Sequence, residues 1–181
     1  MKNKRIHIVI GASCAGKSSF TRNTWIRGRD FKEYKDKVWL TELDDCVLIG
    51  QYSPHHTDKR RVGSDRISRK DIPLILPQIE KLMQETDKDI VMEGDKVLSR
   101  PLWNALIERG WQDQICIYYM RCSWETSLKR NEINGSTQSI PMLKRLCTAS
   151  ENIYNEYKDR LDFYVVDTNG DLDYRRLKLK R

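Results

Sequence analysis

The sequence predicts an α/β fold in which a five-stranded parallel sheet is covered by helices on both faces. Short apolar runs rich in β-branched residues alternate with segments of helical length along the 181 residues. No internal repeat, low-complexity tract or linker interrupts this alternation, and the length suits one compact domain. We therefore expect a single domain over residues 1–181.

The strands are expected where the apolar runs lie and the helices between them. The predicted strands are residues 5–10, 37–40, 89–93, 114–120 and 162–166. The predicted helices are residues 16–27, 72–86, 101–109, 123–130 and 140–160. Pro101 suits the first turn of its helix, where a missing N–H costs nothing.

Residues 49–70 fit neither the helical nor the strand period. The segment is polar and contains Pro54, His55, His56 and Gly63. Long loops inside compact domains are usually functional or disordered, and we expect an ordered functional loop here. Adjacent histidines without a nearby cysteine or carboxylate are poor evidence of a metal, so we assign them no ligand role.

The composition argues against a membrane or exported protein. No apolar run approaches the roughly 18 residues that span a bilayer, and residues 6–10 are too few for the apolar region of a signal peptide. The five cysteines are odd in number and lack metal-ligand spacing, which indicates reduced thiols. We expect a cytoplasmic protein.

The net charge of +7 favours polyanionic partners. ATP, nucleotides and the backbone of nucleic acid all meet that description, and charge alone does not choose among them. Basic residues gather at positions 59–61, 66–70 and 175–181. The last cluster fits a solvated tail equally well.

The strongest motif is G-x-x-x-x-G-K-[ST], the P-loop or Walker A motif, between a predicted strand and a predicted helix. Its backbone N–H groups are expected to face phosphate oxygens, Lys17 to reach the β- and γ-phosphates as a catalytic cation, and Ser18 to bind Mg²⁺. ATP and Mg²⁺ are therefore the expected cofactors. The expected ATP-binding residues of the loop are Gly11, Ser13, Cys14, Ala15, Gly16, Lys17, Ser18 and Ser19.

A carboxylate ends the strand predicted at residues 89–93. Ligands bind at the carboxyl ends of strands in open α/β sheets, so Glu93 is expected near the phosphates. It would orient magnesium through water or accept the proton of the acceptor hydroxyl. The alternative is a solvent-exposed carboxylate at a strand end.

A second acidic cluster follows the strand predicted at residues 37–40. If that strand is parallel, Asp44 and Asp45 flank the same cleft as Glu93. We prefer Asp44 as the catalytic base and place Asp45 among the acceptor-binding residues. The two residues also suit a turn or helix cap.

Basic residues around the predicted helix 123–130 suggest a small lid over residues 121–138. Cations that close over a transferring phosphoryl group stabilise its charge without covalent chemistry. Arg121 is expected to bind ATP and Arg130 to be catalytic, with Lys129 beside it. Each of them is equally compatible with an ordinary helix surface.

These features resemble the nucleoside and nucleotide kinase branch of P-loop proteins. The guanine-reading Asn-Lys-x-Asp motif of GTPases is absent, and Asp167-Thr168-Asn169 does not match it. The chain departs from ordinary thymidylate and adenylate kinases because the branch's usual Asp-Arg pair is missing after the second predicted strand.

A closer resemblance lies in Gly50-Gln51-Tyr52, in the segment from Gly63 to Ser68, and in Val91-Met92-Glu93-Gly94. These motifs resemble phage-type kinases that phosphorylate 5-hydroxymethyluracil within DNA, over residues 11 to about 130. The resemblance implies that Ser64, Asp65 and Arg66 lie in the acceptor loop. Arg66 would hold a phosphate of the acceptor strand, and Asp65 would bond a base edge or the loop backbone. Plain turn chemistry also accounts for Ser64 and Asp65.

The predicted function is transfer of the γ-phosphate of ATP to the hydroxymethyl group of a modified pyrimidine in DNA. The net positive charge agrees with a DNA acceptor. Tyr52 and Trp103 are candidates to stack on an extruded base, although on composition alone each fits a packing aromatic better. The first alternative is a kinase for a free nucleoside, nucleotide or other small acceptor. The second is a nucleotide-dependent switch protein, although no switch threonine motif is recognisable. The oligomeric state stays open.

Overall fold

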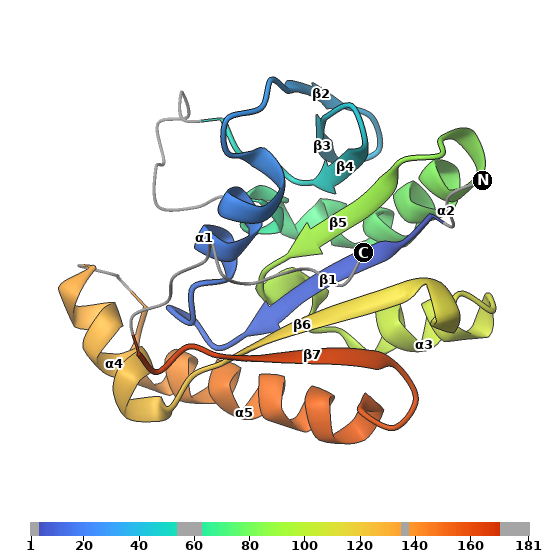
Figure 1. Cartoon of the computed structure of the whole chain (residues 1–181). Coiled ribbons are helices and arrows are strands. Elements are labelled where there is room, and N and C mark those ends of the chain that lie inside the picture. Colours follow the sequence, from blue (N-terminus) through green and yellow to red (C-terminus); the bar gives the residue numbers. More distant parts are fainter. Residues whose placement is uncertain (1–3, 54–62, 135–137, 171–181) are drawn as a thin grey trace.

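A seven-stranded mixed sheet forms the centre of the molecule (Figure 1), which is known from a computed structural model that describes residues 4–53, 63–134 and 138–170. The strand order is β2-β3-β4-β5-β1-β6-β7. In chain order the strands are β1 Ile6–Gly11, β2 Lys32–Lys35, β3 Trp39–Glu42, β4 Cys46–Ile49, β5 Asp89–Glu93, β6 Ile115–Arg121 and β7 Asp162–Asp167.

The sheet corrects the predicted five-stranded parallel sheet. Strands β4, β5, β1, β6 and β7 are parallel to one another, whereas β3 pairs antiparallel with β4 and with β2. The strand predicted at residues 37–40 is therefore the antiparallel β3. The fifth parallel strand is β4, which the sequence analysis missed. Strand β2 was not predicted either, because a partly exposed strand of sequence Lys-Glu-Tyr-Lys has no apolar run.

The helices agree with the predicted segments in position but not always in type. The helix after β1 begins as α1 (Lys17–Thr21) and continues as a π-helical turn over Arg22–Ile26. Short 3₁₀ turns occur at Ser64–Arg66, Arg69–Leu74, Asp95–Val97 and Gln112–Gln114. The longer helices are α2 Ile75–Glu85, α3 Arg100–Glu108, α4 Trp124–Ile133 and α5 Ile140–Tyr157. None of these described helices is long and apolar enough to cross a membrane.

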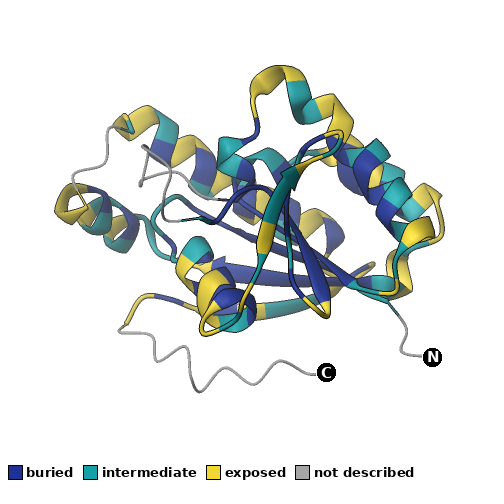
Figure 2. Cartoon of the chain, turned by 90° about the horizontal axis from the view of Figure 1, so that it is seen from above, coloured by how far each residue is buried: buried dark blue, intermediate teal, exposed yellow. Residues whose placement is uncertain are grey.

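Apolar side chains cover both faces of the sheet. On one face, β1 packs through Ile8 against α2, α3 and α5, with Leu106 and Ile153 among the contributors. On the other face, Val9 packs with Phe20 and Trp25 from the helical segment after the first loop. Figure 2 shows the resulting pattern, with dark strands inside and helices that are exposed only on their outer sides. Strand β1 is buried along its whole length, so Gly11 emerges from the middle of the sheet.

Two glycines bring the chain after β4 against the segment that begins at residue 63. The N–H of Gly63 donates to the carbonyl of Gln51 at 2.7 Å. A Cβ on Gly50 would lie 2.1 Å from the carbonyl carbon of Gly63, and Gly50 has a φ of +119°. Only a residue without a side chain allows this approach. The described ends of the loop predicted at residues 49–70 are thus joined, while residues 54–62, with His55 and His56, lie outside the described residues.

Gly50→Ala should destabilise the fold far more than Gly28→Ala. Gly28 also has a positive φ, of +72°, but a Cβ there would meet nothing within 4 Å. We expect Gly28→Ala to cost about 1 kcal/mol of unfolding free energy and Gly50→Ala at least about 2 kcal/mol more, because backbone must move. Urea unfolding measures both values. Equal losses in the two variants would contradict the close approach of Gly50 and Gly63.

Candidate active site

The loop between β1 and α1 forms a concave cradle of backbone N–H groups. Cys14 and Gly16 have positive φ angles of 60° and 88°, which curl the chain between them. Among the described hydrogen bonds, the N–H of Ala15 donates to the carbonyl of Ala12, whereas the N–H groups of Ser13, Cys14 and Gly16 have no acceptor. These three N–H groups are therefore free to donate to an anionic ligand.

Lys17 begins α1 and extends its side chain back across this cradle. Its ammonium donates to the carbonyls of Gly11 at 3.0 Å and Ala12 at 2.8 Å, and it lies 3.5 Å from Asp95 Oδ1. The residue is 7% exposed. Burial alone lowers the pKa of this ammonium, but the surrounding carboxylates, of which Asp95 acts most strongly, raise the pKa above its ordinary value. Lys17 thus carries its charge at the mouth of the cradle.

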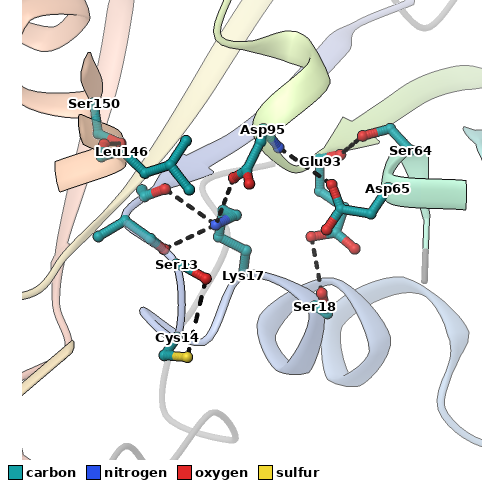
Figure 3. A network of polar contacts seen from close by, with 12 residues as sticks. Ser13, Cys14, Lys17, Ser18, Ser64, Asp65, Glu93, Asp95, Leu146 and Ser150 are labelled. Carbon is teal, nitrogen blue, oxygen red and sulfur yellow. Dashed lines mark hydrogen bonds and ion pairs between the residues drawn. The ribbon is translucent and has the colours of Figure 1, made fainter. Parts of the chain in front are cut away.

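Glu93 lies on the other side of the cradle, where β5 ends. Figure 3 shows its carboxylate facing Ser18, whose hydroxyl donates to Glu93 Oε2 at 3.1 Å. The hydroxyl of Tyr52 donates to Oε1 at 3.3 Å. The residue is 1% exposed, and burial, followed by the charge of Asp65, raises the pKa of Glu93 to about 7. Glu93 is therefore the buried strand-end carboxylate beside the P-loop that the sequence analysis expected, and not a solvent-exposed one.

Three carboxylates, those of Glu93, Asp65 and Asp95, gather around Lys17. Asp65 Oδ1 accepts the backbone N–H of Asp95 at 3.4 Å, and the hydroxyl of Ser64 donates to the carbonyl of Glu93 (Figure 3). Burial and the charge of Asp95 raise the pKa of Asp65. Asp95 had no predicted role, although its position two residues beyond a strand-end carboxylate was a usable signal.

Most of the predicted acceptor-binding side chains bond to the protein itself. Tyr52 and Ser64 support Glu93, as described above, and Arg66 Nη1 donates to the carbonyl of Ser53 at 3.3 Å. Glu33, on the edge strand β2, accepts the N–H groups of Tyr52 at 2.5 Å and Ser53 at 2.7 Å. These residues build the wall of the site. Asp65 differs from these predicted acceptor-binding residues, because its carboxylate lies near Lys17.

Asp44 and Asp45 do not lie beside Glu93, which corrects the expectation that they flank one cleft. They form the turn between β3 and β4, and the carbonyl of Asp45 accepts the N–H of Asp89, where β5 begins. Both residues are exposed at the amino edge of the parallel strands, opposite Glu93. Asp45 pairs with Arg29 at 2.5 Å. The error follows from strand direction, because an antiparallel β3 delivers its carboxyl end to the wrong edge.

Helix α4 packs on the P-loop, but through neutral side chains. The hydroxyl of Ser127 donates to the carbonyl of Ser13 at 2.7 Å, and Asn131 lies against Cys14. Arg130 donates instead to the carbonyl of Gly170 at 3.1 Å. The described part of the predicted lid is therefore a helix that is anchored beside the cradle. Residues 135–137 of the predicted lid lie outside the described residues.

The remaining predicted residues make no described contact with the three carboxylates. Arg121 and Ser19 are exposed. Trp103, a candidate for base stacking, is 1% exposed in the core, and its indole N–H donates to the carbonyl of Val97 at 2.6 Å. That candidate role is wrong, because no base can reach a ring packed against Tyr157. The basic clusters at residues 59–61 and 175–181 lie outside the described residues.

Comparison with known proteins gives a fold likeness only. No protein-family model and no curated protein matches the chain. Similar solved structures include deoxyadenosine kinase from M. mycoides with bound dATP (TM-score 0.48, 12% identity, covering 93% of each chain). They also include that enzyme with the products dCMP and a flexible dCDP (0.47, 14%, covering 94% of this chain and 92% of that one) and with dCTP (0.46, 16%, 93% of each). These likenesses are too distant to carry an inference on activity.

Glu93→Gln should change how stability depends on pH. The folded carboxyl titrates near pH 7 and the unfolded one near its ordinary, lower pKa, so the folded state loses stability as the pH rises between those values. Between pH 5 and pH 8, without nucleotide or metal, we expect the wild type to lose about 2 kcal/mol of unfolding free energy relative to the variant. Urea unfolding at both pH values measures the difference.

The matched control is Glu108→Gln, which removes an exposed carboxylate from α3. This variant should follow the wild type at both pH values. Parallel stability curves for the wild type and Glu93→Gln would contradict a pKa raised by burial.

Proposed function

We propose that this protein is a phosphotransferase that passes the γ-phosphate of ATP to an acceptor hydroxyl. The carrying observation is the arrangement of Lys17, Ser18 and Glu93 around the loop cradle. A buried cation and unpaired N–H groups suit a polyphosphate, and a hydroxyl 3.1 Å from a carboxylate suits a hard divalent cation beside it.

The chain's own residues fit magnesium in the way that Mg²⁺–nucleotide sites usually do. In the described part of the chain no cluster of three or more histidine, cysteine or carboxylate side chains forms a metal cage. Mg²⁺ usually takes one or two protein oxygens and fills its shell with phosphates and water. Ser18 and Glu93 would hold it, and the bound ion would neutralise charge on the triphosphate.

Asp95 is the proposed catalytic base, in place of Asp44. Lys17 would mark the place of the terminal phosphate. Asp95 is the carboxylate that forms an ion pair with Lys17, with 3.5 Å between Nζ and Oδ1. Its side chain is 20% exposed, so an acceptor can reach it, whereas Glu93 is enclosed and bonded to Ser18. In the reaction the acceptor oxygen bonds to the γ-phosphorus, the bond to the β-phosphate oxygen breaks, the hydroxyl proton passes to Asp95, and ADP leaves.

The proposed acceptor is the hydroxymethyl group of 5-hydroxymethyluracil in DNA. The motif resemblance and the +7 charge support it, as does the placement of Asp65 beside Glu93 and Lys17. A free nucleoside or nucleotide is the second candidate, favoured by the enclosure of Tyr52 and Glu93, which leaves little room for bulk around the acceptor. A switch protein would need no carboxylate open to an acceptor, so Asp95 argues against it.

Lys17→Ala should abolish most phosphoryl transfer. Without the ammonium, the charge that develops on the transferring phosphate loses its nearest protein cation, and we expect the rate to fall by about two orders of magnitude or more. Transfer from γ-labelled ATP to DNA with 5-hydroxymethyluracil, to unmodified DNA and to free nucleosides provides the assay. Lys37→Ala, an exposed lysine outside the site, is the control. Near-normal transfer by folded Lys17→Ala would refute the proposal.

Asp95→Asn and Asp44→Asn form a matched pair that tests the base. The amide keeps the shape of the side chain but accepts no proton, so Asp95→Asn should lower kcat by about 10²-fold or more while ATP binding persists. Asp44→Asn should retain the wild-type kcat, because Asp44 is exposed at the opposite edge. The reverse outcome would restore Asp44 as the base and remove Asp95.

A further inference from the structure

A cavity apart from the candidate active site lies at the start of helices α3 and α5. Its volume is about 820 Å³, and Leu98 and Ile153 contribute apolar lining. Three cationic side chains line it, namely Arg100, Lys144 and Arg145. No residue discussed as part of the active site lines this cavity, and no predicted site residue belongs to it.

The cations of this basic cavity are only partly neutralised. Arg100 pairs with Glu156, with 2.5 Å between Nε and Oε2. Among the residues that the structure describes, Lys144 and Arg145 have no carboxylate partner, although Arg145 lies 3.1 Å from the sulfur of Met142. All three cations are exposed. The cavity therefore carries an excess of positive charge that anions can reach.

The basic cavity opens at the same edge of the sheet as the active site. Leu98, in its lining, directly follows the turn Asp95–Val97, and Asp95 contacts Lys17. Helix α5 connects the two places as well, since Leu146 and Ser150 lie on the Lys17 side of the helix (Figure 3), while Lys144 and Arg145 line the cavity. A ligand long enough to fill both would pass along the first half of α5.

We propose that the basic cavity binds the phosphodiester backbone of a nucleic-acid strand, one nucleotide of which is the acceptor. This inference rests on the proposed function, and it names the place where the DNA acceptor is held. The cations are separate and exposed around a volume several times that of one phosphate, as successive phosphates of a strand require. A single phosphomonoester would need convergent, buried donors. Arg66, expected to hold the strand, already binds Ser53.

The test measures binding of a fluorescently labelled single-stranded dT 12-mer by anisotropy over a range of KCl concentrations. The variant Lys144→Ala/Arg145→Ala removes the two unpaired cations. The slope of log K against log salt is negative, and each lost phosphate contact on a single strand reduces its magnitude by about 0.7, so the double variant should flatten it by about 1.4. Its Kd at low salt should rise at least about fivefold. Lys158→Ala/Arg160→Ala, with the same charge loss just beyond the far end of α5, should match the wild type.

The outcomes separate this inference from the proposed function. Equal slopes for both double variants, in folded proteins by circular dichroism, would overturn the basic cavity as a strand site. Displacement of the 12-mer by thymidine monophosphate at equal nucleotide concentration would also overturn it, in favour of a monophosphate site. Transfer from γ-labelled ATP to DNA with 5-hydroxymethyluracil and to free nucleosides is measured in parallel. If neither acceptor is phosphorylated but the slope flattens, the strand site stands and the proposed function fails.

Discussion

The burial of Glu93 is the constraint on which the rest of the site depends. Burying a carboxylate that is 1% exposed costs free energy unless hydrogen-bond donors offset the loss of water. Separate segments of the chain supply these donors. Ser18 comes from the first turn after the P-loop, and Tyr52 from the chain after β4. Tyr52 is held in turn by Glu33 on the edge strand. The antiparallel edge is therefore part of the site's architecture, because it fixes the residues that close over Glu93.

The charges around Lys17 are unbalanced in a way that suits a metal–nucleotide ligand. One ammonium faces the carboxylates of Asp65, Glu93 and Asp95, and burial raises the pKa of two of them. A bare triphosphate would add negative charge to this excess, whereas a triphosphate that brings a divalent cation offsets it. Metal and nucleotide are therefore expected to bind as one unit, and occupancy of the site should pull the raised pKa of Glu93 downward.

The sequence predicted those parts of the candidate site whose residues belong to one short local segment. The P-loop and the strand-end Glu93 were predictable, because a motif and a strand terminus are both local features. Asp44 and Asp45 were misplaced, because apolar periodicity locates β3 but says nothing of its direction relative to β4. Arg66 was assigned to a ligand from the family resemblance of a short motif, and its bond to Ser53 lies beside the close approach of Gly50 and Gly63. Such contacts between distant segments cannot be read from single residues.

Helix α5 relates the proposed chemistry to the proposed binding of a polymer. One side of the helix carries Leu146 and Ser150 toward the P-loop, and an adjacent side carries Lys144 and Arg145 into the basic cavity. Helix α5 packs on β1, and its buried residues include Leu143 and Ile153, so both sides belong to one helix seated on the central strand. A strand held by its phosphates on this helix would therefore be held at a fixed distance from Asp95. That geometry would select the acceptor by its distance from the cavity. Only a nucleotide that extends from the cavity to Lys17 would meet both the catalytic base, Asp95, and the γ-phosphate of ATP.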